Sequence, residues 1–211
     1  MKTLLPACCI AFLFTHISVA QTRSPDLSRS IAFNAGFTKH GTGDMRGIMF
    51  GFSYEKKFRP QLAWGVELGT TIHDGSYGLL VNYNGQEPVD MSYRFTVAGA
   101  QLVGRVGYDF IRSPRIDLGL RLGALVRYQS SSLPNQLSTY FPGPGSQFPF
   151  PVYLAVQSEP QRTVSLGAQS QLFLNYNVGR KMFVGASAGL QLDTNGDTMF
   201  PQLLVSVGRR F

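Results

Sequence analysis

The chain has 211 residues, a formal net charge of +7 and only 15% charged residues, with 23 glycines and 16 phenylalanines. Its two cysteines, Cys8 and Cys9, lie in a leader that we expect to be removed, which excludes a small protein held together by disulfides. No stretch after residue 20 contains the roughly 18 consecutive apolar residues of a membrane-spanning helix. These features leave open a chain that crosses a membrane as strands, because a closed barrel satisfies its own backbone hydrogen bonds.

Residues 1–20 have the pattern of an export signal. Lys2 gives a positive start, an apolar run follows, and Ser18 to Ala20 form a small-residue cleavage site. We therefore expect a signal peptide at 1–20 and one mature domain at 21–211. Lipid attachment at Cys8 is the weaker interpretation, because too few apolar residues precede it.

From residue 31 onward, apolar and polar residues alternate in eight runs separated by turn-forming residues. Alternation with period two predicts β-strands that have one apolar and one polar face. The expected strands lie at about 31–38, 48–55, 62–73, 93–110, 116–129, 164–177, 182–192 and 203–211. The phase slips at 98–100, which predicts a β-bulge there, and residues 79–85 resemble a small hairpin with Asn84-Gly85 at its tip.

The two faces differ most clearly in the run at 116–129. Its polar face carries Asp117, Arg121 and Arg127 among glycines, with Leu125 as the one apolar residue. Charges crowded with glycine suit the packed lumen of a narrow membrane barrel. The sequence therefore predicts an all-β fold, an eight-stranded antiparallel up-and-down transmembrane β-barrel.

The breaks between the runs alternate in length. Those near residues 58, 113 and 180 are short and basic, whereas 74–92 and 130–161 are long and lie at the end where acidic residues collect. Outer-membrane barrels have short periplasmic turns and longer external loops. We therefore expect an integral protein of the cell outer membrane with both termini in the periplasm.

Three segments carry a family resemblance: LVGRVGYDF at 102–110, LGLRLG at 118–123 and GRRF at 208–211. Together with the alternating strands, they resemble the small outer-membrane β-barrel domain family common in Bacteroidota, over residues 28–211. The resemblance implies location and architecture but no single activity. The terminal aromatic Phe211 also resembles the signal read by the barrel-assembly machinery, which would then be a partner during insertion.

Charged residues on the polar faces could either line a pore or fill the lumen with a paired network. The predicted lumen residues are Glu67, Arg105, Asp109, Asp117, Arg121 and Arg127. An eight-stranded barrel is only just wide enough for its own side chains, and a buried network must be paired to be tolerable. We therefore expect a filled lumen with little or no steady ion conductance.

The longest break, 130–161, holds six of the chain's twelve prolines. Its aromatic residues are Tyr140, Phe141, Phe148, Phe150 and Tyr153. Exposed aromatics held by prolines could dock a protein partner, a glycan or lipid headgroups. A mobile shield without a ligand is the equally open alternative.

Two short segments suggest chemistry. Residues 73–76 (His-Asp-Gly-Ser) combine the residue types of a hydrolase, and His40 is the one other histidine after residue 20, but neighbours on a strand point to opposite faces. Residues 193–197 begin like a calcium loop, yet Leu204 occupies the position where such a loop needs glutamate. We therefore expect no catalytic triad and no metal site.

The leading interpretation is a non-enzymatic outer-membrane barrel without a cofactor. It would present 74–92 and 130–161 for binding, envelope maintenance or assembly with a larger complex, with outer-membrane lipid and an envelope protein as partners. The basic residues sit in turns rather than along one strip, which argues against nucleic acid. The alternatives are a lipid-modifying enzyme of the outer leaflet using His73 or Ser76, and a secreted lipocalin-like barrel with its faces inverted.

Overall fold

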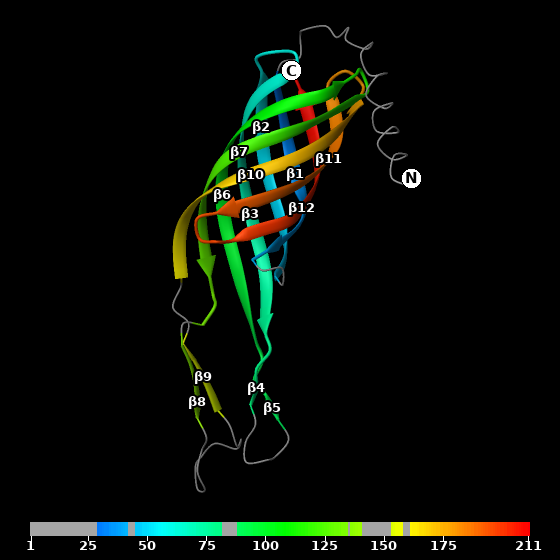
Figure 1. The fold of residues 1–211 in the computed structure, drawn as a ribbon. Coiled ribbons are helices and arrows are strands. Elements are labelled where there is room, and N and C mark those ends of the chain that lie inside the picture. The colour runs from blue at the N-terminus through cyan, green and yellow to red at the C-terminus, as the bar shows by residue number, and fades with distance from the viewer. Residues whose placement is uncertain (1–28, 42–44, 82–87, 135, 141–152, 158–160) are drawn as a thin grey trace, which may run out of the picture.

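The structure, a computed structural model, describes residues 29–41, 45–81, 88–134, 136–140, 153–157 and 161–211. Eight long strands form one closed antiparallel barrel, which confirms the expected fold class (Figure 1). Within these ranges, no helix is long and apolar enough to cross a membrane. The predicted signal peptide lies outside the described residues.

The barrel strands match the eight alternating runs and are somewhat longer. They are β1 (Arg29–His40), β2 (Met45–Lys57), β3 (Leu62–Tyr77), β6 (Tyr93–Arg112), β7 (Ile116–Ser131), β10 (Gln161–Val178), β11 (Met182–Asp193) and β12 (Thr198–Arg210). Each strand pairs with its neighbours in the chain, and β1 pairs with β12 to close the barrel. Arg29 and Phe211 exchange two backbone hydrogen bonds, of 3.2 and 3.0 Å, at the end of this seam.

Two short hairpins extend the barrel. One joins β4 (Leu80–Val81) to β5 (Val89–Asp90), and the other joins β8 (Gln136–Tyr140) to β9 (Tyr153–Gln157). Both lie at the same end, here termed the hairpin end (Figure 1). The tight turns at 58–61, 113–115 and 179–181 lie with the C-terminus at the opposite end, termed the terminal end (Figure 1).

The side chains alternate between lumen and outer surface as the sequence predicts. On β7, Asp117 and Arg127 are buried, whereas Leu122 and Val126 are about half exposed. Large apolar side chains cover the outer surface of all eight barrel strands, and most of the buried side chains in the lumen are polar or charged. This is the reverse of a soluble barrel, so the lipocalin-like alternative, which needs an apolar lumen, is wrong.

Aromatic residues gather on the outer surface near the terminal end. Tyr54 packs edge-on against Trp64 with 5.8 Å between ring centroids, and Tyr108 packs against Phe110 at 5.4 Å. Trp64 and Tyr108 are both more than two-fifths exposed. Such a girdle is typical of the level at which a membrane barrel meets the lipid headgroups.

The bulge predicted at 98–100 is wrong, because the pairing of β6 with β3 and β7 runs through these residues without a shift. The apolar pattern slips there since Val97 faces the lumen while the small Ala98 and Ala100 face outward. The pairing of β12 is irregular on both sides at Phe200-Pro201 instead. Proline has no N–H to donate to a neighbouring strand, which explains why the irregularity lies there.

A second irregularity lies between Asp109 and Ile111, where β6 has one residue more than β7. The extra residue is Phe110, which stays on the outer surface. The strand leaves the barrel here and enters the tight turn at 113–115.

Glycines in the lumen make room for large side chains from the neighbouring strand. Phe173 on β10 pairs with Gly119 on β7 and lies across it, so that a β-carbon at Gly119 would be 2.7 Å from the ring. Phe183 on β11 lies across Gly208 on β12 in the same way. The narrow barrel thereby holds two inward aromatic rings at the terminal end.

We expect Gly119→Ala to destabilise the barrel by about 1–3 kcal/mol, because the methyl group would overpack against both the backbone oxygen of Tyr108 and the ring of Phe173. Gly104→Ala is the matched control, since a β-carbon there meets no heavy atom within 4 Å. The measurement is the urea midpoint of the barrel refolded in lipid vesicles. Equal midpoints for the two variants would contradict the packing.

Candidate functional site: the lumen and the two hairpins

Ion pairs between distant strands fill the lumen near the terminal end. Arg121 on β7 donates two hydrogen bonds to Glu55 on β2, at 3.0 and 2.7 Å. Arg105 on β6 donates to Glu67 on β3 at 2.5 Å and lies 3.7 Å from Glu55. One connected cluster therefore links four strands, and it places two of the three predicted lumen arginines, Arg105 and Arg121, against carboxylates.

Two further pairs cross the lumen at the same end. Lys57 at the end of β2 donates to Asp109 on β6. Arg210 on β12 donates to Asp117 on β7 and to Asn177 on β10, each at 2.5 Å. The Asp117–Arg210 pair joins residues 93 positions apart in the chain and spans from the middle strands to the closing strand.

The described pairs match five cations with five carboxylates. Each of Lys57, Arg105, Arg121, Arg127 and Arg210 faces at least one of Glu55, Glu67, Asp109, Asp117 and Asp193. The sequence reasoning placed six of these ten residues in the network and missed Glu55, Lys57, Arg210 and Asp193. The alternation of apolar and polar residues along β2, β11 and β12 is the signal that could identify these four, since all of them lie at inward positions.

A second polar cluster fills the lumen toward the hairpin end. Arg127 is fully buried, donates to Thr71 at 3.3 Å and lies 3.6 Å from Asp193. His40 and His73 stack obliquely with 4.9 Å between ring centroids. Asp197 lies 3.3 Å from the Nε2 atom of His40, close enough for an ion pair when the imidazole is protonated.

Little space remains between these side chains. Gln202 links Gln169 and Gln191 through hydrogen bonds of 3.0 and 3.1 Å. At the terminal end, Glu55 and Asp117 line a small cavity of about 30 Å³. The arrangement is that of a filled barrel rather than of a wide pore.

The strands β3 and β6 continue beyond the lumen clusters toward the β4–β5 hairpin. Tyr77 and Tyr93 stack on each other at 5.5 Å, and Arg94 pairs with Asp74. The base of the hairpin is held by Ser92, whose hydroxyl accepts a hydrogen bond from the Leu79 backbone and donates to Asp90.

The two hydrogen bonds that Ser92 gives to Asp90, from its hydroxyl and its backbone N–H, lower the pKa of this exposed carboxyl from its usual value. The carboxylate therefore stays charged to a lower pH than that of an ordinary aspartate. It holds the chain in a turn as β5 leads back to β6.

The predicted aromatic loop contains the β8–β9 hairpin. Tyr140 and Tyr153 pair across this hairpin at its far end. Phe141, Phe148 and Phe150 lie outside the described residues. Part of the segment 130–161 is thus a two-stranded extension. Its six prolines do not indicate these strands, because proline is disfavoured within a sheet.

The residues considered for chemistry are separated by the fold. His73 is buried in the lumen, whereas Asp74 and Ser76 are exposed on the other face of β3. Asp193 accepts backbone hydrogen bonds from Asn195 and Asp197, at 3.0 and 3.3 Å, as a turn residue. Among the described residues, no group of three His, Cys, Asp or Glu side chains is placed to hold a metal ion.

Comparison with solved structures shows the same fold in outer-membrane barrels. Neisserial surface protein A matches with a TM-score of 0.54 and 12% identity, over 87% of this chain and 97% of that one. Ail, the attachment invasion locus protein of Yersinia pestis, solved with the heparin analogue sucrose octasulfate, matches with a TM-score of 0.50 and 13% identity, over 88% and 99%. At these identities the likeness establishes the fold alone.

No protein-family model matches the sequence, and the search of curated proteins also gave no match. Membership of the Bacteroidota-type barrel family therefore has no support beyond the resemblance of the segments themselves. This chain nevertheless has the fold of a small eight-stranded outer-membrane barrel.

We expect Asp117→Leu to destabilise the barrel by about 3–5 kcal/mol, because it removes a buried carboxylate that faces Arg210 and keeps the positive charge. The double variant Asp117→Leu with Arg210→Met removes both charges and should recover most of that loss. Urea unfolding in lipid vesicles measures both. If the double variant loses as much stability as Asp117→Leu and Arg210→Met lose in sum, the two charges do not depend on each other.

Proposed function

We propose that the chain is an integral outer-membrane protein whose filled barrel carries two hairpins for binding or assembly outside the cell. The observation that carries the proposal is the division of faces: apolar side chains cover the outer surface, while charged and polar ones are paired inside. A surface so rich in exposed apolar residues needs lipid around it. The likeness in fold to two outer-membrane barrels supports the same conclusion.

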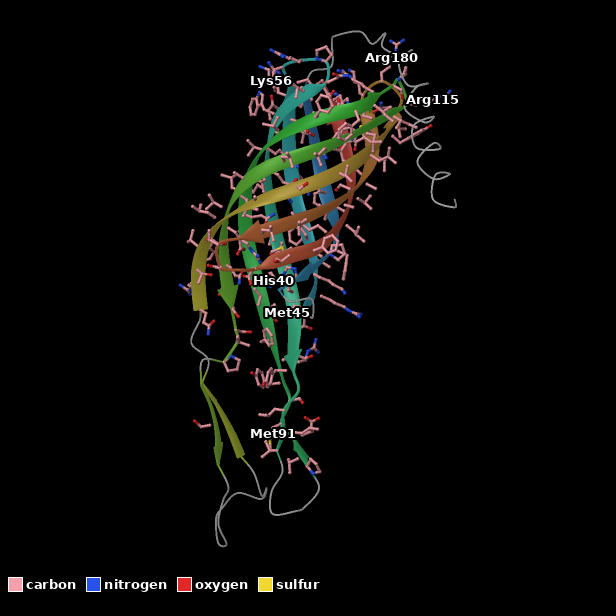
Figure 2. The ribbon with its side chains drawn as sticks, in the orientation of Figure 1. His40, Met45, Lys56, Met91, Arg115 and Arg180 are labelled. Carbon is pink, nitrogen blue, oxygen red and sulfur yellow. The ribbon has the colours of Figure 1, made fainter. Side chains whose placement is uncertain are left out.

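The terminal end would face the periplasm and the hairpin end the exterior. Outer-membrane barrels have short turns on the periplasmic side, and the three tight turns all lie at the terminal end (Figure 1). Lys56, Arg115 and Arg180 mark the same end in Figure 2, and Met91 the opposite one. Phe211, at the terminal end, would serve as the signal for the barrel-assembly machinery.

The hairpin end is the proposed working surface. The strands β3, β6, β7 and β10 have 16 to 20 residues, against about 10 that a tilted strand needs to cross the hydrocarbon core. The chain beyond the membrane would therefore form paired strands, and Tyr77, which is half exposed, stacks there on the less exposed Tyr93. Ordered, projecting aromatics suit a protein or glycan partner at low ordering cost.

A polyanion such as the heparin analogue seen with Ail is a poor candidate for this chain. The segments 74–92 and 130–161 contain four acidic residues and no lysine or arginine, and the nearby Arg94 is already paired with Asp74. A neutral or cationic surface on the partner fits better. The envelope protein partner expected from the sequence satisfies this requirement.

We further propose that the protein is not an enzyme. The candidate residues for lipid chemistry are divided between the lumen and the outside, since His73 is buried and Ser76 is exposed on the opposite face. A lipid-modifying enzyme needs its nucleophile and its base on one accessible face. Unchanged lipid A in cells carrying His73→Ala would agree with this assignment.

The test is co-purification from outer membranes in mild detergent. We expect a specific partner to be retained by the full protein and lost when 132–160 is replaced by a short Gly-Ser turn, because this change removes the β8–β9 hairpin but keeps β7 and β10. The matched control replaces 79–91 with the same turn and removes the β4–β5 hairpin instead.

Loss with only one replacement assigns the partner to that hairpin. Heat-dependent migration on gels shows whether each variant still forms an intact barrel. If both variants are intact and purify with the same proteins as the full chain, the hairpins are not a binding surface. If the full chain is found in the soluble fraction, the membrane assignment itself is wrong.

A further inference from the structure

A shallow groove of about 410 Å³ crosses the outer surface of β10, β11 and β12. Ala186 and Ala188 on β11 form its floor. Ala188 pairs with Leu172 on β10 and Leu203 on β12, and Ala186 pairs in the same way with Leu174 and Val205. Two rows of larger apolar side chains therefore flank a strip of exposed small ones.

Three cations lie at the terminal end of the same wall. Arg180 and Lys181 form the turn between β10 and β11, and Arg209 faces outward on β12 with the same parity as Val205. All three are exposed, and none takes part in an ion pair within the described part of the chain. Their neighbour Arg210 instead points inward to Asp117.

In a barrel embedded as proposed, the groove and the cations would lie in one membrane leaflet. Arg209 is four residues from Val205 and six from Leu203, or about 13 and 20 Å along the strand. Strands of membrane barrels tilt by about 40°, which shortens these spans to about 10 and 15 Å along the membrane normal. Half of the hydrocarbon core is also about 15 Å thick, so one lipid can reach both features.

We propose that this wall binds an anionic glycerophospholipid of the phosphatidylglycerol type, from the leaflet at the terminal end. Its phosphate contacts Arg180, Lys181 and Arg209, and one acyl chain lies in the groove over Ala186 and Ala188. The site rests on the proposed function, since it requires a barrel embedded with its terminal end in the phospholipid leaflet.

The charges favour a lipid over a second copy of the chain. Two barrels that met along this wall in one membrane would be related by a two-fold axis along the membrane normal. Arg209 and Lys181 of each copy would then face the same residues of the other at the same depth, and like charges in register oppose association. An anionic headgroup neutralises the same cluster.

The experiment is native mass spectrometry of the purified barrel in detergent with added phosphatidylglycerol or phosphatidylcholine. We expect preferential retention of phosphatidylglycerol by the full protein. The variant Lys181→Gln with Arg209→Gln should retain it at least about tenfold less, since basic residues near the surface each contribute to the attraction. The control Lys56→Gln with Arg59→Gln removes two charges from β2 and its turn at the same end.

A second pair of variants tests the groove. Ala186→Leu with Ala188→Leu fills it and should weaken retention of phosphatidylglycerol, whereas Ala100→Leu with Ala124→Leu adds the same bulk to the outer face of β6 and β7. Both are substitutions at exposed positions, and gel migration verifies that the barrels are intact.

The proposal is overturned if phosphatidylglycerol is retained no better than phosphatidylcholine, or if the control variants lose it equally. If the purified protein is a dimer, and the groove variant dissociates this dimer without changing lipid retention, the wall is the contact surface of a second copy and not a lipid site. A failure of the proposed function would look different, because the protein would then stay soluble without detergent.

Discussion

Compensation of charge inside the barrel is the constraint on which the rest of this structure depends. A barrel surrounded by lipid must turn its apolar residues outward, and the polar face of every strand then meets the others in a narrow lumen. An ion left unpaired there costs several kcal/mol. The described lumen pairs five cations with five carboxylates, and these pairs join β2, β3, β6, β7, β11 and β12 across the barrel.

The same constraint explains the glycines and the inward aromatics. Phe173 and Phe183 fill the terminal end of the lumen, and each needs a glycine opposite it on the next strand. Arg121 and Arg210 lie over these two rings, with their guanidinium carbons 3.8 and 4.9 Å from the ring centroids. The rings, glycines and ion pairs therefore form one packed unit. A substitution in any of them should alter the packing of the others.

The fold could be predicted from the sequence because period-two alternation carries both strand position and face. All eight barrel strands and the inward placement of residues such as Arg127 follow from it. The pairings do not, since Glu55 and Arg121 meet only through the register and closure of the whole barrel. The position of the irregularity does not follow from apolar character, because Val97 is an apolar residue that faces the lumen within a regular strand. Pro201, which cannot donate a backbone hydrogen bond, is the better signal of an irregular strand.

The two ends of the molecule divide its proposed roles. The terminal end is compact, basic and tightly turned, which suits a lipid headgroup region. The hairpin end continues as paired strands with the stacked Tyr77 and Tyr93, which suits a partner outside the membrane. The alternation of the sequence continues into these extensions only in part, because strands beyond the membrane no longer need an apolar face toward lipid.

The most direct test of the account is site-directed spin labelling of β6 in lipid vesicles. The chain after residue 20 lacks cysteine, so single cysteines can replace Leu102 and Val106 on the outer face, and Gln101 and Val103 in the lumen. The account predicts that labels at the first two positions are open to oxygen dissolved in lipid and closed to a water-soluble nickel reagent. Labels at the other two should be immobile and closed to both. Access of the nickel reagent to Leu102 and Val106 would show that the outer wall faces water, and would contradict the membrane barrel.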